Sequence, residues 1–282
     1  MSGRSPLTTV EQLAQQLASA APPALLDVRW ALGDPHGREH YLAGHIPGAV
    51  FVDLERELSA PPSSEGGRHP LPAAADLQAA ARRWGVRAGG AVVVYDDLGG
   101  QAAGRAWWLL RWAGLGDVTL LDGGLGAWTA SARALATGET VVAAGDVELS
   151  ADQMPVLDVG AAAALAREGL LLDARAAERY RGELEPVDPR AGHIPGARSA
   201  PTGENIDAEG RFLDAAALRE RFEALGAGGG VAIGVYCGSG VSAAHEIAAL
   251  ALAGYEAALF PGSWSAWSAD PARPAAVGAQ PG

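Results

Sequence analysis

Four short sequence blocks occur twice in this chain, once in each half. LLDVR at 25–29 is echoed by LLDAR at 171–175, and GHIPGA at 44–49 recurs at 192–197. AVVVYDD at 91–97 matches VAIGVYC at 231–237, and GGLGAW at 123–128 matches GSWSAW at 262–267. Because the blocks keep the same order at a similar separation, the pattern predicts a duplicated domain. We place the two copies at 1–140 and 141–282.

Short apolar runs alternate with alanine-rich segments of helical length in both copies. VVVY at 92–95 and IGVY at 233–236 each precede a helical segment, and a second apolar run follows. Continuous apolar strands separated by helices are typical of parallel strands that are buried on both faces. The sequence therefore predicts an α/β fold with two tandem domains, each a parallel sheet flanked by helices.

Charge and hydropathy narrow the classes of partner. The 33 acidic residues outnumber the 21 basic ones, which gives a net charge of -12. So acidic a chain favours neither nucleic acid nor an anionic membrane surface as a partner. No apolar run approaches the roughly 18 residues of a membrane span, and residues 1–17 predict an amphipathic helix rather than a secretory signal. With a single cysteine, which fits a reducing compartment, these features predict a cytoplasmic protein.

Comparison of the two copies separates scaffold from chemistry, because features present in both are more often structural. His45 and His193 recur in the GHIPGA block, so we expect them to organise a loop. The Asp-x-Arg of LLDVR and LLDAR recurs as well and predicts a structural ion pair. His36 and His40 have ligand-like spacing but no further ligands nearby, so we expect no metal site.

Cys237 is the only cysteine, and its equivalent in the first copy is Asp96. It ends a predicted buried strand, and the Gly-Ser-Gly at 238–240 permits a tight turn before a helix that begins near Val241. Several N–H groups can then converge on the sulfur. With the helix dipole they favour the thiolate, which is the reactive form of cysteine. We therefore predict that Cys237 is a nucleophile rather than a buried structural residue.

Arg179 is a second feature that only one copy has. It lies in AAERYRG at 176–182, and the equivalent position in the first copy is Gly33. The copy that carries the thiol thus also carries an additional cation, which suits an anionic substrate.

Three chemistries could use a cysteine in such a loop. A cysteine phosphatase needs an arginine six residues after the nucleophile, and Ala243 stands there. Residues 238–243 match the dinucleotide fingerprint G-x-G-x-x-A, but the following strand does not end in the acidic residue that the fingerprint requires. The third chemistry is a thiolate that accepts a sulfur atom and is held as a persulfide by the same N–H groups.

The paired GHIPGA blocks, the VYC loop, the closing GSWSAW and the RYRG beside Arg179 together resemble the tandem-domain rhodanese-type sulfurtransferases. The resemblance covers about residues 7–270. It implies two rhodanese-like domains, the first catalytically inactive and the second catalytic. It also implies a cycle through a Cys237 persulfide without a metal or organic cofactor. The partners it implies are a small anionic sulfur donor and a thiol acceptor such as thioredoxin, or cyanide.

The resemblance also implies the remaining site residues. Ser239 would be catalytic beside Cys237, by relaying a proton or polarising the donor. Arg179 would hold the sulfonate or carboxylate of the donor, with Arg190 as the candidate for a second basic contact. From the first domain, Glu55 and His69 would border the cleft, although the mercaptopyruvate subgroup usually has aspartate where Glu55 stands. The rest of the loop would contact the donor: Gly238, Gly240, Val241 and Ser242.

The loop sequence bears on the donor. Thiosulfate-preferring members of the family carry two basic residues after the cysteine, whereas mercaptopyruvate-preferring members carry Gly-Ser-Gly-Val-Thr. The Gly-Ser-Gly-Val-Ser at 238–242 therefore favours 3-mercaptopyruvate. EPVDPR at 185–190 instead resembles bacterial thiosulfate sulfurtransferases, so a thiosulfate:cyanide sulfurtransferase is the alternative. A non-catalytic persulfide carrier or sensor would share the same loop.

Overall fold

The computed structural model describes residues 5–282, which form two compact units. The first unit takes in the chain through Ser59, Pro72–Met154 and Asp207–Phe212. The second consists of Ala60–Leu71, Pro155–Ile206 and Leu213–Gly282. Residues 1–4 of the predicted first domain lie outside the described residues. The predicted boundary at 140 stays a prediction. The sequence did not indicate that segment 60–71 belongs to the second unit, because that assignment depends on long-range contacts.

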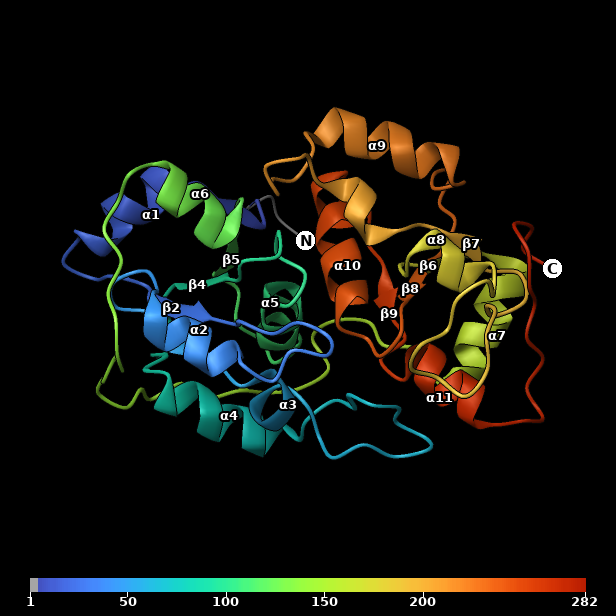
Figure 1. Ribbon diagram of the computed structural model, residues 1–282, viewed down its shortest axis with the longest axis horizontal. Coiled ribbons are helices and arrows are strands. Elements are labelled where there is room, and N and C mark those ends of the chain that lie inside the picture. The colour runs from blue at the N-terminus through green and yellow to red at the C-terminus, as the bar shows by residue number, and fades with distance from the viewer. Residues whose placement is uncertain (1–4) are drawn as a thin grey trace. The chain divides into compact units, whose positions relative to one another are not determined.

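The first unit is built on a five-stranded sheet in which every strand pairing is parallel, in the order β1-β5-β4-β2-β3. Its strands are β1 (Leu7–Thr8), β2 (Ala24–Asp27), β3 (Val50–Phe51), β4 (Val92–Tyr95) and β5 (Val118–Leu121). Its helices are α1 (Val10–Leu17), α2 (Gly37–Ala43), α3 (Leu54–Glu57), α4 (Ala74–Arg83), α5 (Ala103–Trp112) and α6 (Gly124–Ala130) (Figure 1).

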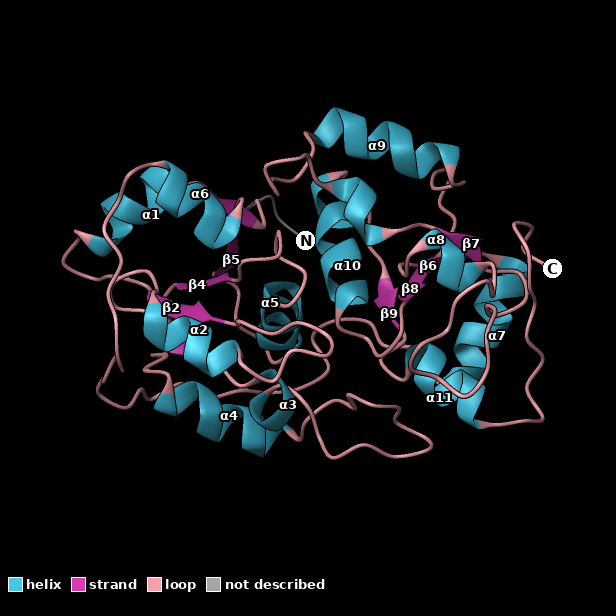
Figure 2. Cartoon of the chain, in the orientation of Figure 1, coloured by secondary structure: helices cyan, strands magenta, loops and turns pink. Residues whose placement is uncertain are grey.

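The second unit has a four-stranded parallel sheet in the order β7-β6-β8-β9. Its strands are β6 (Leu170–Asp173), β7 (Arg198–Ser199), β8 (Ile233–Tyr236) and β9 (Ala258–Leu259). Its helices are α7 (Val159–Glu168), α8 (Ala177–Tyr180), the 3-10 helix η1 (Thr202–Asn205), α9 (Ala215–Ala224), α10 (Ser242–Leu252) and α11 (Ser263–Ala269) (Figure 2). The α/β fold with two parallel sheets is confirmed.

The long interior strands explain the continuous apolar runs of the sequence. Every residue of β4, β6 and β8 is buried, because helices cover both faces of a parallel sheet. In the second unit, α7 packs on β6, and α10 packs on β8 and β9. The core there gathers Leu171, Ile194, Tyr236 and Trp264. Burial of such a side chain stabilises the fold by about 1.5–3 kcal/mol.

The two histidines of the GHIPGA blocks have equivalent surroundings. His45 stacks on Tyr41 with ring centroids 4.1 Å apart, and its Nδ1 lies 2.9 Å from the Tyr41 carbonyl oxygen. His193 stacks on Tyr180 at 3.7 Å, and its Nδ1 lies 2.8 Å from the Tyr180 carbonyl oxygen. These contacts support the loop-organising role expected from the repeat.

The Asp-x-Arg pairs are also structural in both units. The Arg29 Nη2 donates to Asp27 at 2.7 Å, and the Arg175 Nη2 donates to Asp173 at 2.5 Å. The same Arg175 nitrogen donates to the carbonyl of Gly192, at the start of the second GHIPGA block. In the first unit, the Arg29 Nη1 donates to the His40 carbonyl in α2 at 2.9 Å, so each pair ties the end of a strand to a nearby segment.

Candidate active site

Cys237 lies at the carboxyl end of β8, where the chain turns into α10. Its side chain is 2% exposed, and the Gly240 N–H donates to its Sγ at 3.1 Å. Gly240 has a φ of +79°, a conformation that favours glycine and brings its N–H toward the sulfur. Val241 is buried, and Ser242 is the first residue of α10. The structure thus has the strand, turn and helix that the sequence predicts around this thiol.

The first turn of α11 forms hydrogen bonds with the main chain of the cysteine loop. The Ser263 Oγ accepts from the Cys237 N–H at 3.1 Å and donates to the Phe260 carbonyl at 2.9 Å. The N–H groups of Trp264 and Ser265 donate to the carbonyls of Cys237 and Gly238, both at 2.9 Å. Sequence reasoning missed this support, although GSWSAW has serines where GGLGAW of the first copy has glycines.

Ser239 and His69 are brought together as predicted site residues. The His69 Nδ1 and the Ser239 Oγ lie 2.7 Å apart and share a hydrogen bond. Both side chains are buried. His69 belongs to the segment Ala60–Leu71 and so to the second unit. A buried hydroxyl held by an imidazole can donate or accept a proton close to the thiol.

Two guanidinium groups flank Gly238 in this loop. A Cβ built on Gly238 would lie 3.3 Å from the Arg179 Nη1 and 3.0 Å from the Arg68 Nη2. Arg179 was expected here, whereas Arg68 was not. The signal for Arg68 was its place directly before His69 in GRHPLP. The loop that carries the thiol therefore has two cations beside its main chain.

Two carboxylates hold these guanidinium groups. The Arg179 Nη2 donates to Glu185 at 2.6 Å and to Asp188 at 3.1 Å. The Arg68 Nη1 donates to the other oxygen of Asp188. Burial raises the pKa of Asp188 above its ordinary value, and Arg68 acts most strongly against that shift. Asp188 thus bridges the two arginines.

Arg190 has different surroundings from those expected of a donor-binding residue. Its guanidinium donates to the main-chain carbonyls at the end of α11, which are those of Trp267, Ser268, Asp270 and Arg273, at 2.7–3.1 Å. Its own carbonyl accepts from the Trp264 Nε1 at 2.8 Å. These contacts fix the chain after α11 and give no support to the predicted substrate contact.

Glu55 lies on α3 in the first unit, where its Oε1 accepts from the Trp30 Nε1 at 2.8 Å. Its predicted place beside the donor stays a prediction.

Among residues 5–282, no group of three or more His, Cys, Asp or Glu side chains could hold a metal ion.

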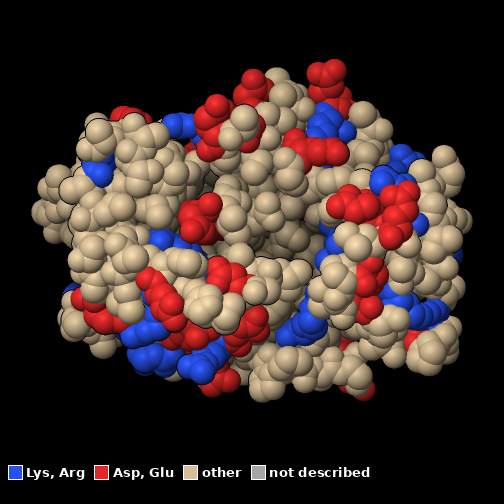
Figure 3. All heavy atoms as spheres, in the orientation of Figure 1, with Lys and Arg blue, Asp and Glu red and all other residues tan. Residues whose placement is uncertain are grey.

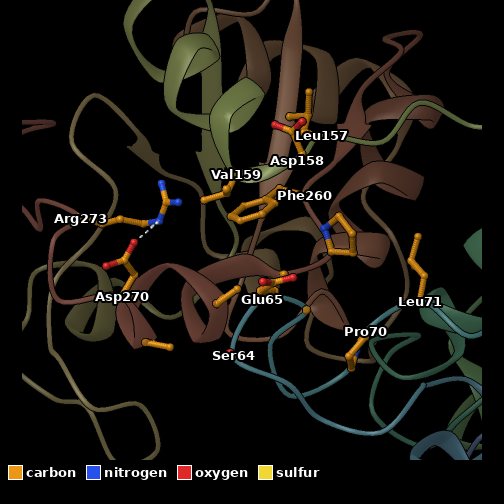
Figure 4. Close-up of a pocket in the computed structure, with 15 residues that line it drawn as sticks. Ser64, Glu65, Pro70, Leu71, Leu157, Asp158, Val159, Phe260, Asp270 and Arg273 are labelled. Carbon is orange, nitrogen blue, oxygen red and sulfur yellow. Dashed lines mark ion pairs between the residues drawn. The ribbon is translucent and has the colours of Figure 1, made fainter.

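A separate cavity of about 690 Å³ lies in the second unit. Figure 4 shows Pro70, Leu71, Ser64 and Glu65 on one side of it, and Val159 and Phe260 on another. The Arg273–Asp270 ion pair, 3.3 Å long, lies at one edge of it. Its lining includes neither Cys237 nor the arginines beside Gly238, so we do not assign the chemistry to it.

Asp96 shows what the equivalent loop does in the first unit. Its carboxylate is fully buried and accepts four main-chain N–H groups at 2.8–2.9 Å, from Leu98, Gly100, Ala102 and Ala103. Burial raises the pKa of Asp96, and the four donors act against that shift. The loop after β4 is therefore an anion cradle that is filled by a side chain of the protein itself.

The distribution of charged side chains on the surface does not indicate one class of partner. On the face drawn in Figure 3, acidic and basic side chains lie interspersed. Within the part of the chain that the structure describes, no helix is long and apolar enough to cross a membrane.

Comparison with known proteins adds to this geometry. Residues 9–131 and 159–270 each match the rhodanese-like domain. A Pseudomonas aeruginosa protein named as a 3-mercaptopyruvate sulfurtransferase is 50% identical over 279 residues, which cover 96% of this chain and 98% of that protein. A Mycobacterium tuberculosis protein named as a thiosulfate sulfurtransferase, SseB, is 48% identical over 275 residues, with 96% and 97% covered. The Escherichia coli 3-mercaptopyruvate sulfurtransferase structure, SseA, has a TM-score of 0.80 at 32% identity and covers 93% of this chain and 100% of its own.

The two parallel α/β units, one with a buried cysteine followed by a glycine that two arginines flank, fit the domain that these comparisons identify. The chain belongs to the rhodanese family, with the domain of that family in both halves. It is a sulfurtransferase, in line with relatives that match nearly its whole length.

Proposed function

We propose that this sulfurtransferase takes a sulfur atom from 3-mercaptopyruvate, holds it as a persulfide on Cys237, and passes it to a thiol acceptor or cyanide. The observation that carries the proposal is the Cys237 Sγ in a loop whose Gly240 N–H points at it from 3.1 Å. The name of the Pseudomonas aeruginosa relative supports this donor. The loop 238–242 supports it as well, because it lacks basic residues.

The first half-reaction forms one bond and breaks one. The Cys237 thiolate attacks the donor sulfur, so a sulfur–sulfur bond forms while the carbon–sulfur bond breaks. The electron pair of the broken bond stays on the carbon as the enolate of pyruvate, which takes up a proton. The Ser239 hydroxyl, held by His69 at 2.7 Å, is placed to hydrogen-bond the developing enolate oxygen or to relay that proton.

The second half-reaction restores the free cysteine. An acceptor thiolate attacks the outer sulfur of the persulfide, the acceptor leaves as a persulfide, and Cys237 leaves as a thiolate. With cyanide the product is thiocyanate. We assign acceptance to a small thiol or to a thioredoxin-type protein, and place the enzyme in the cytoplasm. The single cysteine, which has no partner for an internal disulfide, supports a reducing compartment.

The first unit has no thiol to offer, and its anion cradle is filled by Asp96. We therefore assign the catalytic step to the second unit and a supporting role to the first. Glu55 remains a predicted contributor from the first unit.

Thiosulfate is the second candidate donor, because the Mycobacterium tuberculosis relative is named for it and because two arginines flank Gly238. The test mixes the purified protein with either donor and follows the gain of one sulfur on Cys237 by intact mass, then sulfur release to cyanide or dithiothreitol. We expect multiple turnovers with 3-mercaptopyruvate and none in Cys237→Ser. Loading once without turnover would favour a protein-fed carrier, and no loading from either donor would overturn the proposal.

A further inference from the structure

Arg68 is held in a fixed place by the chain around it. The segment Ala60–Leu71 belongs to the second unit, and the Arg68 N–H donates to the Ser265 Oγ at 3.1 Å. A Cβ on Gly67 would lie 2.4 Å from that same Ser265 oxygen and 2.5 Å from the Gly262 carbonyl oxygen, so only glycine allows this close approach. The main chain of Arg68 is therefore pressed against the first turn of α11, which also supports Cys237.

The side chain of Arg68 points to the same place as that of Arg179. The Arg68 Nη2 and the Arg179 Nη1 are the atoms that a Cβ on Gly238 would meet first. Asp188 binds the other terminal nitrogen of each arginine. The bridging carboxylate thus keeps two like charges side by side, which would otherwise repel each other, and turns one terminal nitrogen of each toward the cysteine loop.

Both arginines also retain unused donors. The Nε atoms of Arg68 and Arg179 are buried and have no hydrogen-bond acceptor among the described residues. Buried N–H groups without an acceptor destabilise a protein. Such donors beside a reactive thiol point to an oxygen-rich anion that accepts from them when it binds.

We propose that Arg68 is a donor-specificity residue, which together with Arg179 forms a two-guanidinium clamp beside Gly238 that suits a dianionic sulfonate-type donor such as thiosulfate. This inference rests on the proposed sulfur transfer and concerns thiosulfate, the second candidate donor. Two guanidinium groups can together donate to the three oxygens of a sulfonate, whereas one guanidinium is enough to bind both oxygens of a carboxylate. Thiosulfate carries two negative charges and 3-mercaptopyruvate mainly one at neutral pH, so thiosulfate depends more on the second cation.

The test compares Arg68→Gln with the wild type for both donors. We expect the KM for thiosulfate to rise by at least about tenfold, the effect of losing one charge-assisted hydrogen bond. The KM for 3-mercaptopyruvate should rise no more than about threefold, and kcat should change little for either donor. Arg68→Lys keeps the charge but loses the planar guanidinium with its paired donors, so its KM for thiosulfate should lie between those of the wild type and Arg68→Gln. The thiosulfate Kd of Cys237→Ser, with and without Arg68→Gln, measures the same loss without chemistry.

Arg181→Gln is the matched control, because Arg181 lies near Arg179 but pairs with Glu183 at 2.7 Å. It should leave both KM values unchanged. Equal changes in both donors for Arg68→Gln, or no change, would overturn the clamp and leave Arg68 as a structural ion pair. Failure of the wild type to load sulfur from either donor would instead overturn the proposed function. The two failures are therefore distinguishable.

Discussion

At Cys237 and at Asp96, a buried strand ends in a turn that points main-chain N–H groups at one side chain. Asp96 accepts four of them, and Cys237 accepts the N–H of Gly240. Such N–H groups favour negative charge in both loops. The side chain then decides the chemistry, because a carboxylate only accepts hydrogen bonds, whereas a thiolate can also bond to sulfur.

Asp96→Ala tests whether the four main-chain N–H groups of this loop depend on the Asp96 carboxylate. It leaves four buried N–H groups without their acceptor, so we expect the free energy of unfolding to fall by about 3–5 kcal/mol. Asp96→Asn, which keeps one acceptor oxygen, should cost less. Urea unfolding followed by circular dichroism measures both variants. A loss below about 1 kcal/mol in Asp96→Ala would show that water replaces the carboxylate in the cradle.

Among the elements, the first turn of α11 has an unusual main-chain conformation. Ser263 has a φ of +53°, and its equivalent Gly124 has a φ of +51°. A residue with a side chain pays about 1 kcal/mol for this region. In the second unit the serine is present nonetheless, and its Oγ accepts the Cys237 N–H. The hydrogen bond to the Cys237 main chain therefore offsets the backbone strain.

Two substitutions of Ser263 separate strain from support. Ser263→Ala keeps the strain and leaves the buried Cys237 N–H without its acceptor, so unfolding should require about 1–3 kcal/mol less. Ser263→Gly loses the same bond but relieves the strain, so it should lose about 1 kcal/mol less stability than Ser263→Ala. Persulfide formation, followed by stopped flow and mass, should slow in both. An unchanged rate in Ser263→Gly would mean that the serine only shapes the turn.

At the scale of the whole molecule, residues far apart in the chain meet at the candidate site. His69 and Ser239 are 170 positions apart and share a hydrogen bond. The segment that carries His69 lies within the first sequence repeat, yet it belongs to the second compact unit. The two halves therefore have similar folds, but the segment Ala60–Leu71 contributes His69 to the candidate site of the second unit only.

A double-mutant cycle on His69→Ala and Ser239→Ala tests whether the pair acts as one group. Because each residue needs the other, we expect the losses in kcat with 3-mercaptopyruvate to be non-additive, with a coupling of about 1 kcal/mol or more. The pair Thr202→Val and His245→Ala, which breaks a buried contact of 2.7 Å elsewhere in the second unit, serves as a control and should leave kcat nearly unchanged. Additive losses at His69 and Ser239 would assign them separate roles.

The duplicated α/β architecture and the buried strands could be predicted from the sequence alone, and the structure confirms them, whereas the role of Cys237 as nucleophile stays a prediction. Repeats and apolar runs are local patterns that follow from strand and helix geometry, and the first half has Asp96 where the second has Cys237. Which arginines lie beside Gly238, the residue after Cys237, could be seen only in the tertiary structure. Arg190, expected at the donor, holds the end of α11, while Arg68 reaches Gly238. The direction of a long side chain depends on loops packed from distant parts of the chain, and no local periodicity encodes that packing.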